Sequence, residues 1–311
     1  MRLERDQVDA ALAGLDLGRV ATVTEMSGGS SSVFRVDFLS GTSVVLKMYR
    51  EGYHTGPAKD AFAAAQLDGV AVPVARHLLI DESRTRLPFD FVVTSYLPGV
   101  TAGTLRDHAD IASLYRQTGA LLRRLHEIAM PAYGRFDGQG IVDPVVSNEE
   151  YIGRRIAYGF ERFAAFGGDP VLADRLRRIA EARLPDIVPF SKGAVFAHDD
   201  LHPDNVLAVE DGHGRLVLSG LIDFGNAQAA DPVLDLAKCL FCSEHDAPGS
   251  TPHILAGYGR IDHPDPEEAI WYYTLLHRVT MWFWLRHIGV IPTPDTPSGL
   301  IDDLRAMAES G

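Results

Sequence analysis

The chain has 311 residues, a hydrophobic content of 46% and a charged content of 23%, values typical of a soluble globular protein. This length favours two domains or lobes over a single core. A net charge of −13 argues against a nucleic-acid-binding protein, whose affinity depends on a basic surface. The same charge is compatible with a cationic small-molecule partner.

No targeting or membrane segment is recognisable in the sequence. Residues 1–6 have mixed charge and no apolar run, and no stretch approaches eighteen apolar residues. Cys239 and Cys242 are the only cysteines, and a zinc site needs four ligands, so two reduced thiols are the simpler interpretation. We therefore expect a cytoplasmic protein without a membrane partner.

The first hundred residues are predicted to form a sheet. After a short helix at residues 6–15, alternating apolar residues predict strands at 21–26, 33–38, 44–49, 77–81 and 91–97. A helix is predicted at 57–67, with Pro57 in its first turn. The pattern therefore predicts a five-stranded antiparallel sheet with one associated helix.

A loop rich in glycine and serine joins the first two strands of this sheet. It could present N–H groups and hydroxyls to phosphate oxygens, although similar sequences form ordinary turns. Its candidate phosphate-binding residues are Gly28, Gly29, Ser30 and Ser31. Lys47 interrupts the apolar third strand, which favours a phosphate-directed role over that of an exposed edge lysine. Asp60, the only carboxylate of the 57–67 helix, could pair with Lys47 or interact with the helix dipole.

Beyond Pro98 and Gly99, which mark a hinge, the pattern becomes helical. Helices are predicted at residues 111–130, 149–166, 170–183, from 231 onwards, and 266–287. Residues 133–146, rich in Gly, Pro and Asp, are predicted to be a loop. His126 is expected to be a buried structural histidine.

Titratable side chains concentrate in residues 198–205, His-Asp-Asp-Leu-His-Pro-Asp-Asn. Pro203 argues against a helix here, and a predicted hairpin follows, with strands at 206–209 and 216–218 and then Asp223-Phe224-Gly225. Phosphoryl transfer needs Mg²⁺ on hard oxygen ligands and a carboxylate that orients the attacking hydroxyl. Asp200 fits the base, while Asn205 and Asp223 fit the metal ligands.

These motifs resemble those of the aminoglycoside phosphotransferase family, whose fold is related to that of protein kinases. The family's catalytic loop reads His-x-Asp-x4-Asn, and His198, Asp200 and Asn205 occupy those positions. Its metal-binding aspartate matches Asp223 and its strand lysine matches Lys47.

The resemblance implies an α+β, protein-kinase-like fold of two lobes. The N-terminal nucleotide-binding lobe, residues 1–97, would hold the five-stranded antiparallel sheet and its helix. The mainly helical C-terminal lobe, residues 98–311, would divide into a core (98–135 and 186–240) and a substrate subdomain (136–185 and 241–311).

The resemblance also implies Mg²⁺ as the cofactor and ATP or GTP as the phosphoryl donor. Lys47 would contact the nucleotide phosphates, with Asp60 in place of the family's usual glutamate. The adenine would meet the hinge formed by Ser95, Tyr96 and Leu97. Asp199 stands where the family usually has glycine, and it either contacts a substrate ammonium group or faces solvent.

The family phosphorylates hydroxyls of aminoglycosides, macrolides and cationic peptide antibiotics, and of metabolites such as choline, homoserine or fructosamines. The acidic chain, with no basic cleft motif, favours a cationic antibiotic, and the glycine loop, the Asp60 helix and residues 276–278 are most similar to the hygromycin-type branch. We therefore expect a monomeric antibiotic kinase that confers resistance, with a metabolic hydroxyl kinase as the alternative. Acidic residues that could contact ammonium groups, or simply lie on solvated faces, are Asp199, Asp231, Glu244, Asp246, Glu267 and Glu268.

Two other functions compete with this one. A metallohydrolase could use His198, His202 and the neighbouring aspartates as metal ligands, but it leaves Lys47 and the glycine loop unexplained. A pseudokinase acting as a binding module is disfavoured because Lys47, Asp200, Asn205 and Asp223 are all present.

Overall fold

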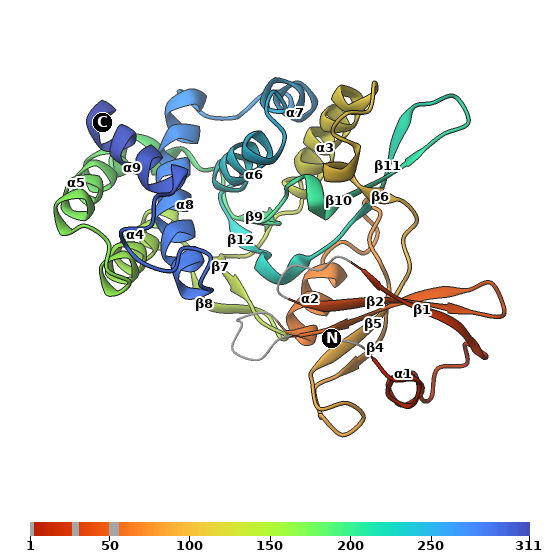
Figure 1. Cartoon of the computed structure of the whole chain (residues 1–311). Helices are drawn as coiled ribbons and strands as arrows, with labels where there is room; N and C mark the ends of the chain where they lie inside the picture. The colour runs from red at the N-terminus through yellow and green to blue at the C-terminus, as the bar shows by residue number, and fades with distance from the viewer. Residues whose placement is uncertain (1–2, 27–30, 50–55) are drawn as a thin grey trace.

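The computed structural model describes residues 3–26, 31–49 and 56–311. An N-terminal β-sheet lies on one side of the molecule and a larger, mainly helical C-terminal part on the other (Figure 1). Each part has its own cluster of buried apolar side chains, and the larger cluster lies among the C-terminal helices. None of the described helices is long and apolar enough to cross a lipid bilayer.

The N-terminal sheet is antiparallel, with the strand order β1-β2-β3-β5-β4. Its strands are β1 (Val20–Met26), β2 (Ser32–Phe38), β3 (Ser43–Met48), β4 (His77–Asp81) and β5 (Phe91–Ser95). Buried and half-buried residues alternate along β2 and β3, as expected for strands with one face in the core. Helix α1 (Arg5–Ala11) buries Val8 and Ala11 in this small core.

Helix α2 (Pro57–Ala65) connects the sheet to the rest of the molecule. Its residues contact β4 on one side, and η4 (Phe224–Asn226) and β7 (Tyr133–Phe136) of the C-terminal part on the other. Ala63 and Ala64 belong to the C-terminal core. The helix therefore holds its side chains between the two parts.

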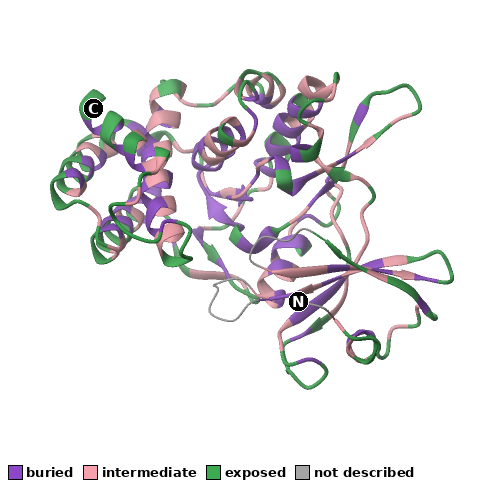
Figure 2. Cartoon of the chain, viewed as in Figure 1, coloured by how far each residue is buried: buried purple, intermediate pink, exposed green. Residues whose placement is uncertain are grey.

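The C-terminal part contains seven α-helices among the described residues. They are α3 (Ile111–Leu125), α4 (Asn148–Ala165), α5 (Pro170–Ile187), α6 (Pro232–Asp246), α7 (Thr251–Tyr258), α8 (Pro266–His287) and α9 (Gly299–Ser310). Helix α8 contacts α4, α5, α6 and α9. Buried and more exposed stretches alternate along this helix (Figure 2).

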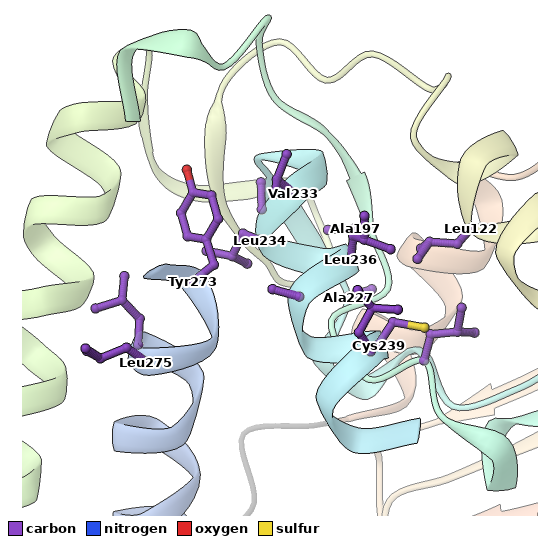
Figure 3. Packing of buried hydrophobic residues seen from close by; sticks show 14 of the residues in the cluster. Leu122, Ala197, Ala227, Val233, Leu234, Leu236, Cys239, Tyr273 and Leu275 are labelled. Atoms are coloured by element: carbon purple, nitrogen blue, oxygen red, sulfur yellow. The ribbon is translucent and has the colours of Figure 1, made fainter. Parts of the chain in front are cut away.

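The aromatic residues of α8 supply much of this core. Tyr272, Tyr273 and Trp282 are almost completely buried. Tyr273 lies beside Leu234 of α6, whereas Leu275 points away from α6 (Figure 3). Core packing therefore accounts for the aromatic content of this helix.

Two small sheets complete the C-terminal part. One has the order β11-β10-β6 and the other β8-β7-β12-β9. Their strands are β6 (Val100–Thr101), β7, β8 (Ile141–Val145), β9 (Val195–Ala197), β10 (Val206–Glu210), β11 (Leu216–Leu221) and β12 (Gln228–Ala230). The 3₁₀ turns η1 (Ala102–Leu105) and η2 (Val188–Phe190) join neighbouring elements.

The expected α+β class is confirmed, whereas several predicted details are wrong. Residues 133–146 are not a loop, because they form the β7–β8 hairpin. Pro144 is tolerated since β8 is the edge strand of its sheet. Helix α5 continues past its predicted end through Pro185, which lies in the last turn. Helices α7 and α9 were not predicted from the sequence.

Candidate active site

The acidic stretch after β9 is fixed to the core by one buried carboxylate. Asp235, on α6, accepts the backbone N–H groups of His198 and Asp199, each at 2.8 Å. Its Oδ2 atom also lies 3.0 Å from Nε2 of His126, whose Nδ1 atom lies 2.7 Å from the Tyr258 hydroxyl. Burial alone would raise the pKa of Asp235, but His126 and His198 outweigh it and lower that pKa. The segment that carries Asp200 is thus held by α6, whose Asp235 is itself fixed by His126 at the end of α3.

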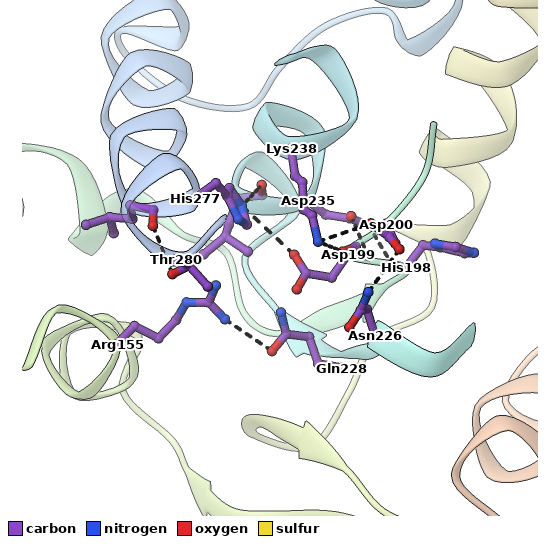
Figure 4. Close-up of polar contacts among 12 residues, drawn as sticks. Arg155, His198, Asp199, Asp200, Asn226, Gln228, Asp235, Lys238, His277 and Thr280 are labelled. Carbon is purple, nitrogen blue, oxygen red and sulfur yellow. Dashed lines mark hydrogen bonds and ion pairs between the residues drawn. The ribbon is translucent and has the colours of Figure 1, made fainter. Parts of the chain in front are cut away.

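Asp200 follows this anchor, and both of its carboxylate oxygens have partners (Figure 4). Lys238 Nζ lies 3.3 Å from Oδ1, and the Asn226 side-chain amide donates to Oδ2 at 2.9 Å. Burial favours the neutral acid, but Lys238 and the imidazoles of His202 and His198 outweigh it, so the pKa of Asp200 is lowered. Asp200 is therefore an ionised carboxylate held in one orientation.

Asn205 contacts Asp200, and Asp223 lies three residues before Asn226, the other amide that contacts Asp200. Asn205, in η3 (Pro203–Asn205), donates its side-chain N–H to the Asp200 carbonyl at 2.9 Å, which leaves its amide oxygen to accept other bonds. Asp223 follows β11 in a left-handed conformation with φ of 64°, and its side chain is 45% exposed. One amide oxygen and one accessible carboxylate are the hard donors that Mg²⁺ uses together with water and substrate phosphates. These residues therefore fit a magnesium site.

Lys47 joins the sheet to this site. Its ammonium lies 2.9 Å from Asp60 Oδ2 and 3.0 Å from Asp223 Oδ1. Tyr49 donates its hydroxyl to the same Asp60 oxygen. Burial disfavours the charge of Lys47, but the two carboxylates outweigh it and raise the pKa of Lys47. The shorter aspartate in place of glutamate thus still forms a close ion pair, because α2 lies near the sheet.

The structure describes some, but not all, of the other candidate nucleotide-binding residues. Gly28, Gly29 and Ser30 lie outside the described residues, and Ser31 directly precedes β2. Ser95 ends β5, and its N–H donates to the Arg76 carbonyl at 2.9 Å. Tyr96 and Leu97 follow in the connection to β6, where the Tyr96 ring lies against the Arg35 guanidinium.

Asp199 is the only substrate candidate that adjoins Asp200. Asp231 is 3% exposed and caps α6, and it accepts bonds from Asn148 and Tyr273. Glu267 and Glu268 lie at the start of α8, about 15 Å along the helix axis from His277, which is near Asp199. Glu268 is paired with Arg183. The surroundings of these three carboxylates favour structural and surface roles over substrate contact.

Glu244 and Asp246 also have local partners. Glu244 accepts the N–H groups of Gly249 and Thr251, and Asp246 lies 3.5 Å from His202 Nδ1. His198, by contrast, directs its Nε2 atom at the Ile222 carbonyl. The two imidazoles thus face different partners, and the described residues contain no group of three or more His, Cys, Asp or Glu side chains suited to a metal. This geometry does not favour the metallohydrolase.

Sequence reasoning missed several residues of the site. Lys238 lies one helical turn after Asp235. Lysines are rare in this chain, so its presence could have indicated a specific role. Asn226 directly follows Asp223-Phe224-Gly225. Arg155 of α4 and Gln228 of β12 carried no recognisable motif, since they reach the site only through the fold (Figure 4).

Solved structures show the same fold over nearly the whole chain. The structure of aminoglycoside phosphotransferase APH(4)-Ia is 18% identical, covers 98% of each chain and has a TM-score of 0.73. A thermostable mutant of that protein, in a ternary complex with ADP and hygromycin B, gives a TM-score of 0.69 at 18% identity, covering 94% of this chain and 95% of that chain. A choline/ethanolamine kinase family protein from Mesorhizobium loti is 16% identical, with a TM-score of 0.64, 98% of this chain covered and 90% of that chain. No curated protein matches the chain by sequence comparison.

The phosphotransferase enzyme family matches residues 22–272, which include Lys47, Asp60, Asp200, Asn205 and Asp223. This match confirms the resemblance drawn from the catalytic loop and the Asp-Phe-Gly motif. The chain belongs to the phosphotransferase enzyme family.

Proposed function

We propose that this protein transfers the γ-phosphoryl group of ATP or GTP to a hydroxyl of a cationic small molecule. The observation that supports this function is the convergence of Lys47, Asp200, Asn205 and Asp223, contributed by the sheet and by the segment around β10 and β11. Phosphoryl transfer depends on positioning and on charge neutralisation, and these residue types supply both.

Asp200 is proposed to act on the acceptor. Its carboxylate would accept the hydroxyl hydrogen and direct the oxygen at the phosphorus. Lys238 and Asn226 fix its two oxygens, so the carboxylate would be oriented before the substrate binds. The lowered pKa of Asp200 keeps it ionised at neutral pH.

The nucleotide is proposed to bind between the sheet and Asp223. Lys47 would hold its phosphates, Asp60 would orient Lys47, and the backbone of Ser95 to Leu97 would contact the base. Asn205 and Asp223 would hold Mg²⁺, which when bound neutralises charge on the phosphates. In this proposal residues 1–97 are the nucleotide-binding lobe and 98–311 the catalytic and substrate lobe of a cytoplasmic monomer.

For the acceptor we propose an aminoglycoside or a similar cationic antibiotic, whose phosphorylation would confer resistance. The likeness in fold to the hygromycin B complex and the carboxylate of Asp199 beside Asp200 support this choice. A metabolic amino alcohol of the choline type is the second candidate, supported by the choline/ethanolamine kinase fold. Expression in a susceptible bacterium separates them, since only the first should raise the inhibitory concentration of the antibiotic.

The role of Asp200 can be tested by Asp200→Ala. We expect the rate of acceptor phosphorylation to fall about 10²- to 10⁴-fold, because the group that orients the hydroxyl is lost. Nucleotide affinity, measured by titration calorimetry with Mg²⁺ and a non-hydrolysable ATP analogue, should stay nearly unchanged. Asp204→Ala, in the same loop but exposed, serves as the matched control. Unchanged turnover in Asp200→Ala would remove Asp200 from the mechanism.

A further inference from the structure

Polar side chains that phosphoryl transfer does not require gather next to Asp200. Arg155 of α4, Gln228 of β12 and His277 of α8 surround the carboxylate of Asp199 (Figure 4). They come from three separate elements of the C-terminal part.

Arg155 and Gln228 form the hydrogen-bond-donating side of this group. The Gln228 Oε1 atom accepts the Tyr151 hydroxyl at 2.6 Å and Arg155 Nη1 at 3.3 Å. Since a guanidinium can only donate, the oxygen of the Gln228 amide is identified, and its nitrogen must point elsewhere. That nitrogen is buried without a hydrogen-bond partner. Within the described chain Arg155 forms no ion pair, because its partners, Tyr151 and Gln228, are neutral.

Asp199 forms the acidic side. Its Oδ1 atom is buried and has no hydrogen-bond partner. The nearest ring nitrogen, Nε2 of His277, is 3.9 Å away and donates instead to the Leu234 carbonyl at 2.9 Å. Burial lowers the pKa of His277 well below its usual value, with Arg155 and Lys238 adding to the effect, so the imidazole is neutral. Asp199 therefore has a charge that no described side chain neutralises by direct contact.

Two more cations face the same group. Arg135 of β7 is the cross-strand partner of Gln228. Lys59, on α2, approaches from the opposite part of the molecule, and its pKa is lowered by burial and by Arg135 and Lys238 while Asp60 and Asp199 raise it. Across the described residues neither cation forms an ion pair. Arg135, Arg155 and Lys59 are thus cations near Asp199 that no described ion pair neutralises, whereas Lys238 is paired with Asp200, and Lys47 with both Asp60 and Asp223.

We propose that the acceptor is zwitterionic: it carries an anionic group, in the simplest case a carboxylate, in addition to its ammonium and hydroxyl groups. The anion binds Arg155 and the Gln228 amide nitrogen, the ammonium binds Asp199, and the hydroxyl meets Asp200. The inference rests on the proposed transfer to a hydroxyl at Asp200, and it assigns a zwitterionic acceptor in place of the polycationic antibiotic proposed above.

Charge balance explains why this ligand fits better than a polycation. A zwitterion supplies a partner to both Arg155 and Asp199, so each desolvated charge gains a charge-assisted hydrogen bond. A second ammonium group would instead lie close to Arg155 and Lys59, and like charges at short range repel strongly between groups that are partly shielded from water. The net negative charge of the chain therefore does not predict the charge of its acceptor site.

The test compares three sets of hydroxyl compounds in a nucleotide-consumption assay. They are polycationic aminoglycosides such as hygromycin B, amino alcohols such as ethanolamine and choline, and hydroxy amino acids such as serine and homoserine. We expect the highest kcat/KM in the third set. With the best of those acceptors, Arg155→Met should raise KM about 30-fold or more and change kcat little, because the lost contact is made equally in the ground and transition states.

Two further variants distinguish a loss of acceptor binding from a loss of folding. Arg155→Lys keeps the charge and should recover part of the affinity, whereas Arg154→Met removes an exposed arginine from the same helix and should leave KM unchanged. The inference is overturned if another set gives the best acceptor, or if Arg155→Met leaves KM within about twofold of the original value. Turnover of polycations or amino alcohols alone would leave the proposed function standing, whereas no turnover in any set would contradict both.

Discussion

Asp199 adopts a left-handed backbone conformation, with φ of 53°, directly before the proposed base. Glycine favours this region of φ, and aspartate and asparagine tolerate it better than most residues. The backbone thus accounts for the glycine usual at this position in the family. Here the chain places a carboxylate there instead, and burial raises the pKa of Asp199 because solvent is lost around its charge.

Asp199→Asn should therefore stabilise the free protein near neutral pH by about 1 kcal/mol. The folded-state pKa of Asp199 lies above its unfolded value, so the wild type loses stability as pH rises from about 3.8 through the raised pKa. Asparagine keeps the backbone conformation and removes this cost. Thermal unfolding of both proteins across this pH range should show an advantage for Asp199→Asn that grows with pH and then levels off.

The same substitution should weaken binding of the acceptor. An amide cannot neutralise an ammonium group, so KM for the best acceptor should rise about 10-fold or more. A variant that loses both stability and activity would show that Asp199 has a structural role instead.

At the scale of elements, α6 supports the segment that carries the proposed base. Asp235 uses separate oxygens for the His198 and Asp199 amides, while one turn later Lys238 donates to the Asp199 carbonyl and pairs with Asp200. Spacing of three residues places Asp235 and Lys238 on one helix face. The helix therefore orients both the backbone and the side chain of the proposed base.

Asp235→Asn should cost about 2–4 kcal/mol of stability, because an amide N–H₂ would face a buried backbone donor. The carboxylate's folded pKa is lowered by His126, so its contribution is present above the unfolded value near 3.8 and is lost as pH falls below it. The stability difference between the wild type and Asp235→Asn, from chemical denaturation, should accordingly shrink in acid. Asp174→Asn, an exposed aspartate on α5, should leave stability nearly unchanged at every pH.

At the scale of the molecule, Lys47 is the charge that joins the sheet to the C-terminal part. Its two carboxylate partners come from α2 and from the segment after β11, 176 residues away in the chain. Asp60 is buried, with its Oδ1 atom free of hydrogen bonds, so its charge depends on Lys47 and Tyr49.

Lys47→Met should destabilise the protein by about 3 kcal/mol, because it leaves a buried carboxylate without its cation. The rise in melting temperature on adding Mg²⁺ and ATP should also become smaller, since the variant binds the nucleotide less tightly. Lys192→Met, which removes an exposed lysine, should behave as the wild type in both measurements. The double variant Lys47→Met, Asp60→Asn should regain part of the stability but not the nucleotide effect.

The sequence alone was sufficient for the parts of the site that are contiguous in the chain. Residues 198–205 and 223–225 form a loop and the end of a hairpin, so their spacing carries the chemistry directly. The strands and the α8 helix followed from apolar periodicity. The β7–β8 hairpin did not, because its Gly and Pro residues are typical of a loop and only pairing with β12 makes it a strand.

Only the tertiary structure showed which charged side chains surround the proposed acceptor site. Arg135, Arg155, Gln228 and His277 lie on four different elements, and Lys59 comes from α2. Electrostatic interaction depends on distance in space and on burial, neither of which is written in the spacing of these residues. The sequence by itself determined the phosphotransferase chemistry around Asp200, whereas the cationic side chains that face Asp199 became recognisable only when the fold brought them together.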